Sequence, residues 1–251
     1  MLLTIDVGNT NTVLGAFEGD LLTDSWRVKT DSRTTADEMM LTFRGLLAEQ
    51  PPLTGIALCS TVPAVLREMR LMFDTYFRSV STVIVEPGVK AGVSVLTDNP
   101  REVGADRIVN TLAVYERYGG PAIVVDFGTS TNLDVVSSRG DFLGGALAPG
   151  IQISLDALAQ RAAQLRKVEL VRPRSAIGRN TVEALQSGAL YGFAGQVDGL
   201  VRRITEELGE VKAVVATGGL AGIVVPESRT ITDHDPDLTL HGLRLVFLRN
   251  R

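Results

Sequence analysis

Two short polar segments of this chain read almost alike and lie far apart in the sequence. The first spans Asp6–Thr12 and the second, 120 residues later, spans Asp126–Asn132; each begins with an aspartate two residues before a glycine. Each segment follows one apolar run and leads into another, which is the pattern of a strand, a tight turn and a second strand. Such a repeat at wide spacing predicts two related halves that face one nucleotide.

The residue types of both segments fit loops that bind phosphate. Glycine lets the backbone turn sharply and approach a ligand closely, while Asn, Thr and Ser side chains and backbone N–H groups donate hydrogen bonds to phosphate oxygens. The leading aspartate can hold a cation directly or through water. The same residues are frequent in ordinary hairpin turns. One copy alone favours the plain turn, whereas two matched copies favour phosphate loops.

Length and charge exclude several classes of protein. A chain of 251 residues with 45% hydrophobic residues can bury a sizeable core, and the repeat favours two domains over one. A net charge of -4 and a pI near 5.3 give no global positive field for nucleic acid or an anionic membrane. The apolar stretches are too short for a membrane span, and no basic leader precedes the first strand-like residues. We therefore expect a cytoplasmic protein.

Cysteine and histidine are too scarce for thiol, zinc or triad chemistry. Cys59 is the only cysteine and lies in an apolar run, so we interpret it as a small buried hydrophobic residue. The two histidines, His234 and His241, have no spacing that would gather zinc with it. A Ser-His-Asp hydrolase is also disfavoured, since no Gly-x-Ser-x-Gly segment precedes either histidine. The chemistry must depend on carboxylates and bound cations.

Strands and helices alternate along the first half, which favours an α/β fold. Thr35 and Glu38 form a capping box for one helix, and Pro63 suits the first position of another. A third helix is expected to open at Pro100. The expected elements are strands Leu2–Ile5, Val13–Phe17, Leu21–Val28, Leu53–Ser60 and Thr82–Val85, and helices from Thr35, over Pro63–Phe77 and over Pro100–Tyr118.

The second half repeats this order after a Gly-Gly-Pro break at residues 119–121, where we place the domain boundary. A glycine-rich connection at residues 144–150 follows the hairpin. Next come a helix to about Leu165, a long helix over Thr181–Leu208 and a strand over Val211–Ala216. The strand leads into Thr217, Gly218 and Gly219, where the glycine pair can admit a base or a ribose. The alternative is a turn before a helix, without a ligand.

The long helix carries a stripe of glycines. Gly188, Gly192, Gly195 and Gly199 fall on one helical face. Because each interior glycine costs about 1 kcal/mol relative to alanine, four on one face indicate a close approach by another helix or another subunit. Packing within a membrane is disfavoured by the charged residues of the same helix.

A third constellation lies between the two loops, at residues 99–107. It contains Asp106, which shares a helical face with Asn110, and Arg107. Asp106 can accept a proton from a substrate hydroxyl, as phosphoryl transfer requires. Arg107 can hold a substrate carboxylate or steady the charge of the transferring phosphoryl group. A solvated Asp–Arg pair on a helix surface explains the spacing equally well.

Taken together, these segments resemble the type III pantothenate kinases, which belong to the actin, sugar kinase and Hsp70 ATPase superfamily. The resemblance covers nearly the whole chain, and its order and distances are highly specific. It rests on Asp6–Thr10, Gly104–Arg107, Asp126–Thr129, Gly144-Gly145 with Pro149-Gly150, Gln186–Gly188 and Thr217–Gly219. The chain departs from the family at Thr97, where many relatives carry an aromatic residue.

The resemblance implies a fold and an activity. The fold is α/β, with two ribonuclease H-like (actin-like ATPase) domains whose mixed sheets are flanked by helices, and an active site in the cleft between them. Residues 1–118 would hold the first phosphate loop and the Asp106 helix, and residues 119–251 the second loop, the adenosine motif and the dimer helix. The activity is ATP-dependent phosphorylation of pantothenate to 4'-phosphopantothenate, the first step of coenzyme A biosynthesis.

The resemblance also implies roles for single residues. Asp106 would be the catalytic proton acceptor, Asp126 would hold a monovalent cation, K⁺ or NH₄⁺, and Asp6 would hold Mg²⁺, through water or directly. The implied ATP-binding residues are Asp6, Val7, Gly8, Asn9, Thr10, Asn11, Thr12, Val13, Thr129, Gly218 and Gly219. The implied pantothenate-binding residues are Gly104, Ala105, Asp106, Arg107 and Thr181. The family is dimeric with helices at the interface, so we expect a homodimer and no nucleic acid or membrane partner.

Three other functions stay open on sequence alone. A kinase of the same superfamily for another small hydroxylated substrate would keep both loops. A non-catalytic regulator is a different class, since some relatives were first described as accessory factors for transcription. The acidic pI of this chain disfavours direct DNA binding. A structural or interaction module explains neither loop.

Overall fold

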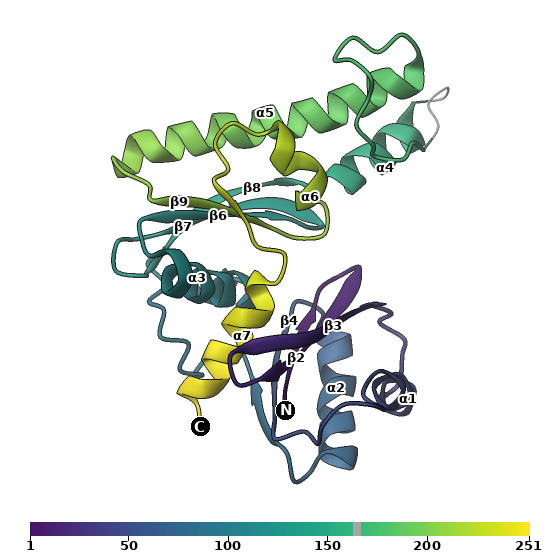
Figure 1. Ribbon diagram of the computed structural model, residues 1–251, viewed down its shortest axis with the longest axis vertical. Coiled ribbons are helices and arrows are strands. Elements are labelled where there is room, and N and C mark those ends of the chain that lie inside the picture. Colours follow the sequence, from purple (N-terminus) through teal and green to yellow (C-terminus); the bar gives the residue numbers. More distant parts are fainter. Residues whose placement is uncertain (163–166) are drawn as a thin grey trace. The chain divides into compact units, whose positions relative to one another are not determined.

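The computed structural model describes residues 1–162 and 167–251, which form two compact units (Figure 1). Unit 1 comprises Met1–Val93, Asp98–Ala113 and Thr239–Arg251, and unit 2 comprises Ser94–Thr97 and Val114–Leu238. Each unit is built on a five-stranded mixed sheet. No helix in the described ranges is both long and apolar enough to cross a membrane.

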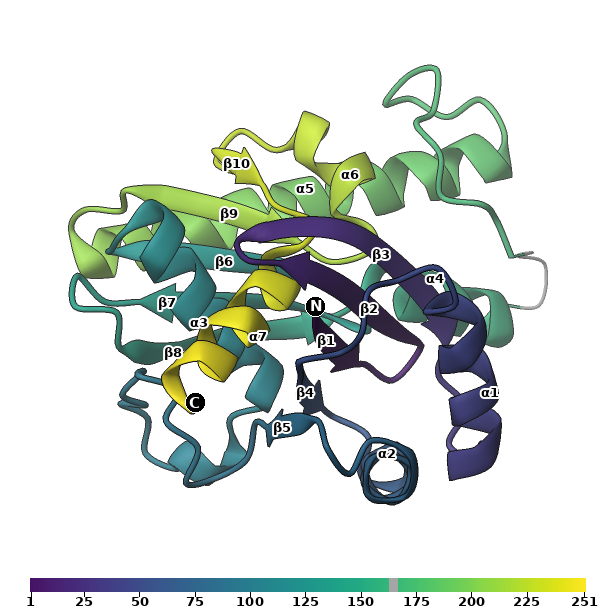
Figure 2. The same cartoon turned by 60° about the horizontal axis from the view of Figure 1, so that its bottom comes forward.

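The sheet of unit 1 has the strand order β3-β2-β1-β4-β5 (Figure 2). The first three strands form an antiparallel meander, and β4 and β5 add to β1 in parallel. The strands are β1 (Leu2–Val7), β2 (Asn11–Glu18), β3 (Leu21–Lys29), β4 (Gly55–Ser60) and β5 (Ser81–Ile84). A parallel strand needs a crossover connection, and the helices α1 (Ala36–Leu46) and α2 (Pro63–Tyr76) supply those connections.

Both crossover helices begin where the sequence predicts. Thr35 and Glu38 form the expected capping box of α1, which stabilises the helix start by about 1 kcal/mol. Pro63 is the first residue of α2, where its missing N–H costs nothing. The apolar faces of both helices cover one side of the sheet, where Ile5 and Phe43 lie in the same core.

The opposite side of this sheet is covered by two other helices. Side chains alternate between the faces of a strand, so Asp6 points away from the core that contains Ile5. On the Asp6 side, Cys59 packs in a core with residues of α3 (Ala105–Tyr118) and α7 (Leu238–Arg249). Thr239 Oγ1 donates to the buried Asn110 Oδ1 at 2.8 Å and joins these helices. Asn110 therefore links α3 to α7.

Unit 2 repeats the plan of unit 1. Its strand order, β10-β9-β6-β7-β8, is the order of unit 1 read from the other edge, with β6 in the place of β1. The strands are β6 (Ala122–Phe127), β7 (Ser130–Val136), β8 (Phe142–Pro149), β9 (Ala213–Thr217) and β10 (Asp233–His234). One face packs on α4 (Ile151–Arg161), α5 (Thr181–Leu208) and the short α6 (Ala221–Val224) (Figure 1).

Two expected elements differ in the structure. The helix expected from Pro100 is only a 3-10 turn over Pro100–Glu102, and α3 begins at Ala105, because the chain becomes extended at Val103. The glycine-rich segment 144–150 is mostly part of β8, where a register shift beside Gly144 accommodates the positive φ of the two glycines. The expected helix end near Leu165 lies outside the described residues.

The two compact units also differ from the expected domain ranges 1–118 and 119–251. The C-terminal helix α7 belongs to unit 1, since its apolar residues fill the core on the Asp6 side of that sheet. The unit boundary falls inside α3, between Ala113 and Val114. Unit 1 is therefore built from three separate segments of the chain.

Candidate active site

The first phosphate loop is a tight turn between β1 and β2. Gly8 N–H donates to the Asn11 carbonyl at 3.1 Å, and a side chain at Gly8 would press on that oxygen. Asn9 and Thr10 are exposed at the tip and free to face a ligand. Thr12 is different, because its hydroxyl is buried and shares a hydrogen bond of 2.9 Å with Thr30. Thr12 therefore anchors the loop to Thr30, and its hydroxyl does not face a ligand.

The side chains of Val7, Asn11 and Val13 divide between the two faces of the sheet. Val7 belongs to the core under α1 and α2. Val13 is the strand partner of Asp6 and therefore shares its face. Asn11 lies on that same face, two residues before Val13.

Asp6 is the penultimate residue of β1 and is half-buried. Cys59 is its partner on the parallel neighbour β4, and the Cys59 thiol donates to Asp6 Oδ1 at 3.3 Å. Burial, and next the negative charge of Asp106, raise the pKa of Asp6 to about 6, while the thiol opposes this shift. Cys59 is buried as predicted, and burial and the nearby carboxyls raise its pKa, so the thiol keeps its proton as a donor.

Asp106 is the second residue of α3 and is also half-buried. Burial raises the pKa of Asp106, while the Arg107 backbone N–H, which donates to Asp106 Oδ1 at 3.0 Å, and the Arg107 charge lower it. Gly104 makes this geometry possible, because a Cβ there would collide with Asp106 Oδ1. The structure therefore places Asp106 among protein atoms and close enough to Asp6 to raise its pKa. A solvated surface pair does not describe it.

These two carboxyls make unit 1 suited to a hard cation. Mg²⁺ is typically held by one or two carboxylates with waters and substrate phosphates. Asp6 and Asp106 repel each other when both are ionised, and a cation relieves that repulsion. In the part of the chain that the structure describes, no group of three or more His, Cys, Asp or Glu side chains is arranged to hold a metal ion. The residues therefore fit an ion that the substrate helps to hold.

The second loop repeats the first in unit 2. Asp126 is the penultimate residue of β6, as Asp6 is of β1, and Gly128 N–H donates to the Ser130 carbonyl at 3.0 Å. Thr129 is exposed at the tip. Gly218 lies against this loop with a φ of +90°, and a Cβ there would collide with Asp126 Oδ1. The structure thus brings the predicted residues Asp126 and Gly218 together, with Gly219 exposed beside them.

A buried polar group extends the Asp126 face. Asn132 and Thr217 are the strand partners of Asp126 on β7 and β9, so their side chains point to the same face of the sheet. Both are buried. Asn132 Oδ1 has no hydrogen-bond partner among the described residues. An orphaned buried oxygen beside a carboxylate fits a site for a monovalent cation.

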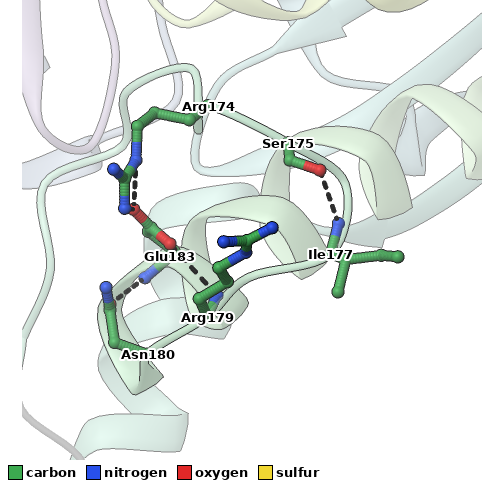
Figure 3. A network of polar contacts seen from close by, with 6 residues as sticks. All are labelled: Arg174, Ser175, Ile177, Arg179, Asn180 and Glu183. Carbon is green, nitrogen blue, oxygen red and sulfur yellow. Dashed lines mark hydrogen bonds and ion pairs between the residues drawn. The ribbon is translucent and has the colours of Figure 1, made fainter.

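Thr181, the remaining predicted substrate residue, is the exposed first residue of α5. The segment before it is held in place by Glu183 (Figure 3). The Glu183 carboxylate pairs with Arg174 and accepts from the Arg179 backbone N–H at 3.0 Å. Asn180 caps the helix by accepting from Glu183 N–H at 2.9 Å. These contacts fix the helix start and leave the Thr181 side chain exposed.

Two contacts of the site were missed by sequence reasoning. Cys59 was interpreted only as a hydrophobic residue, and Asn132 only as a polar residue of the second phosphate loop. Each is the strand partner of a loop aspartate, on β4 or β7. The strand register shows these contacts. Cys59 ends an apolar run whereas Asn132 precedes one, so the sequence holds no shared signal for them.

A model of the family described as type III pantothenate kinase matches residues 2–203. The chain belongs to this family. Type III pantothenate kinases of Frankia alni and Salinispora arenicola are 68% and 65% identical to it, and in both comparisons the match covers all of each chain. The type III pantothenate kinase of Rhodococcus jostii is 59% identical over the whole of this chain and 96% of its own.

Solved structures with low sequence identity share the fold of this family member. A Campylobacter jejuni protein of the Baf family of transcriptional activators has a TM-score of 0.63 at 18% identity, covering 99% of this chain and 98% of its own. The ROK hexokinase of Thermus thermophilus has a TM-score of 0.55 at 14% identity, covering 100% and 99%. The expected two-domain α/β fold of actin-like ATPases and sugar kinases is confirmed.

Proposed function

We propose that this protein transfers a phosphoryl group from ATP to pantothenate and forms 4'-phosphopantothenate, the first step toward coenzyme A. The observation that carries this proposal is the match to type III pantothenate kinases along the whole chain. The half-buried carboxyls Asp6 and Asp106, beside a phosphate loop, supply the chemistry that such a kinase needs.

In this proposal Asp106 accepts the proton of the pantothenate hydroxyl. A base works best when its pKa lies near the working pH, and burial raises the pKa of Asp106 in that direction. The Arg107 N–H donates to Asp106 Oδ1 and fixes the carboxyl beside Gly104. Arg107 also carries a charge that suits the carboxylate of pantothenate. Gly104, Ala105 and Thr181 would complete the substrate site.

In this proposal each of the two loops binds ATP phosphates. Backbone N–H groups and the exposed Asn9, Thr10 and Thr129 side chains donate to phosphate oxygens. Asp6 would hold Mg²⁺, which neutralises phosphate charge when it is bound. Gly218 and Gly219 leave room for the nucleoside, since neither presents a side chain.

A monovalent cation, K⁺ or NH₄⁺, would bind at Asp126 in unit 2. Support comes from the oxygen atoms on this face, which are the ligands that hard cations prefer. Asn132 Oδ1 is buried beside Asp126 and has no hydrogen-bond partner in the described residues, so a cation would satisfy it. We further propose that the protein acts in the cytoplasm as a homodimer, with the α5 glycine stripe at the interface.

One assay separates this function from its rivals. ADP release is measured with ATP and Mg²⁺, with and without pantothenate, in K⁺ and in Na⁺, beside a panel of sugars and acetate. We expect release that depends on pantothenate and is faster in K⁺. Release with another acceptor in place of pantothenate identifies a different kinase of the superfamily. Folded protein that releases no ADP with any acceptor supports a regulator.

A further inference from the structure

A cavity of about 360 Å³ opens beside the first phosphate loop in unit 1. Asn9 of the loop forms one wall, and the segment that follows β3 forms most of the others. The wall residues that matter here are Asn9, Lys29, Thr30, Ser32 and Arg33. All of them have hydrogen-bond donors in their side chains. Only Asn9 was expected at a ligand site from the sequence.

The segment after β3 is fastened to the phosphate loop. Lys29, the last residue of β3, is the strand partner of Asn11. Beyond it, Thr30 N–H donates to the Thr10 carbonyl at 3.0 Å, and the Thr30 hydroxyl meets Thr12 at 2.9 Å. The backbone of Lys29 is therefore fixed beside the loop, and Lys29 shares the Asp6 face because it pairs with Asn11.

The charge of this cavity is positive. Arg33 Nε and Nη2 reach the two carboxylate oxygens of Asp31 at 3.2 and 3.1 Å, so that pair is neutral overall. Lys29 forms no ion pair within residues 1–162 and 167–251. The Arg33 hydrogen bonds and, more weakly, the charge of Lys29 lower the pKa of Asp31. Lys29 and Arg33 against Asp31 leave this wall with one net positive charge, at the edge of the first phosphate loop.

We propose that Lys29 and Asn9 bind the terminal phosphate of a nucleoside triphosphate, and that Lys29 makes the protein prefer the triphosphate to the diphosphate. This inference rests on the proposed function, because the first loop is taken to hold nucleotide phosphates. Phosphate is favoured over the carboxylate of the second substrate, since the cavity lies directly on the loop whose Asn9 and Thr10 side chains are exposed at the tip.

The test compares nucleotide affinities of three variants by isothermal titration calorimetry. Lys29→Met removes the charge and keeps most of the side chain, and Lys29→Arg keeps the charge. Lys90→Met is the matched control, because Lys90 is an exposed lysine of unit 1 outside the cavity. The probes are Mg²⁺ with a non-hydrolysable ATP analogue, with ADP, or with inorganic phosphate, and pantothenate alone.

Loss of one charge-assisted contact weakens binding by about tenfold. We expect Lys29→Met to bind the ATP analogue about tenfold more weakly and ADP within twofold of the wild type, whereas Lys29→Arg and Lys90→Met keep the wild-type ratio. The wild-type preference for the analogue should also fall more steeply with added NaCl than that of Lys29→Met, since Lys29 is exposed.

Three results overturn the inference. They are an unchanged affinity ratio in Lys29→Met, an equal loss for analogue and ADP, and a loss confined to pantothenate. Failure of the proposed function is a separate result. Wild-type protein that binds nucleotide but phosphorylates no pantothenate would refute the proposed function, while the affinity ratio would still decide the role of Lys29.

Discussion

Ionised Asp6 lowers the free energy of unfolding of the protein without ligands. Its pKa in the folded state is raised from 3.8 to about 6, chiefly by burial. A carboxyl with a raised pKa favours the folded state most at low pH, and that stability is lost as the pH rises through the folded pKa. The loss occurs between pH 4 and 7. The protein is therefore less stable at the pH values at which Asp6 is ionised and able to bind a cation. Such a cost in stability is common at functional sites.

Asp6→Asn should remove this pH dependence. Without Mg²⁺ at pH 8, we expect the variant to have a larger free energy of unfolding than the wild type, by about 3 kcal/mol at most, from a shift of roughly two pKa units. At pH 4 most of the difference should be gone, because Asp6 is then protonated in the folded state and only partly ionised in the unfolded state. Urea denaturation across this range measures it. Asp74→Asn, at an exposed carboxyl of α2, is the control.

A constant difference between Asp6→Asn and the wild type from pH 4 to 8 would contradict the cost assigned to Asp6. It would mean that the charge of Asp106 and the burial of Asp6 do not disfavour ionisation. A difference of the same size in Asp74→Asn would assign the effect to net charge instead.

The identities of the site residues could be predicted, but their contacts could not. Asp6, Asp126 and Asp106 lie in short local motifs, and the residue types of these motifs indicate binding of phosphate and cations and proton transfer. The Cys59–Asp6 hydrogen bond joins residues 53 positions apart and depends on the parallel register of β1 and β4. Local propensity carries no information about that register. Asn132 lies only six positions from Asp126, and its pairing with Asp126 depends on the register of the hairpin of β6 and β7.

At the scale of elements, α5 does more than cover a sheet. Asp198 lies in the middle of this helix and is buried. Burial alone would raise its pKa, but hydrogen bonds from Ser228 and Thr230 and from the backbone N–H groups of Arg229 and Thr230 lower it. These bonds, 2.6 to 3.2 Å long, tie the loop before β10 to the helix. The sequence indicated only that Asp198 disfavours a membrane helix.

Asp198→Ala should lower the free energy of unfolding by about 3 kcal/mol or more, because the Arg229 backbone N–H and the Ser228 and Thr230 hydroxyls lose their acceptor. Asp198→Asn keeps one acceptor oxygen and should cost less. Chemical denaturation of both variants checks the order. Equal stability of Asp198→Ala and the wild type would show that the loop finds other partners.

The glycine stripe of α5 is open in a single chain. A Cβ at Gly188, Gly192, Gly195 or Gly199 would meet nothing within 4 Å. We therefore expect Gly192→Leu to fold normally but to elute as a monomer, because the larger side chain blocks the proposed dimer interface. Light scattering coupled to gel filtration gives the mass.

Gly45→Leu is the matched control, since Gly45 is also an exposed helical glycine with open space around it, on α1. It should keep the dimer. A dimeric Gly192→Leu protein would place the interface elsewhere, and a monomeric wild type would refute the dimer itself.

The ends of helices could be predicted where the local sequence marks them. The starts of α1 and α2 and the full length of α5 agree with prediction because caps, Pro63 and apolar periodicity are local. The start of α3 differs, since the chain becomes extended at Val103 and the helix begins only after Gly104. The glycines of β8 were assigned to a loop because strand propensity disfavours them.

At the scale of the whole molecule, the repeat seen in two short segments extends to both sheets. β1 and β6 occupy equivalent places, and each has a loop aspartate at its penultimate position. The sequence could predict two halves, because the hairpins repeat. It could not predict that α7 returns to unit 1, since apolar spacing does not say which sheet a helix covers.

Formation of product by wild-type protein and by Asp106→Asn tests the central claim most directly. With ATP, Mg²⁺, K⁺ and pantothenate, mass spectrometry should find 4'-phosphopantothenate and ADP in equal amounts from the wild type. Asp106→Asn should fold and bind nucleotide, yet form product about 10²- to 10⁴-fold more slowly, because it lacks the base. Absence of 4'-phosphopantothenate from the wild type, or near-normal turnover in Asp106→Asn, would contradict the account.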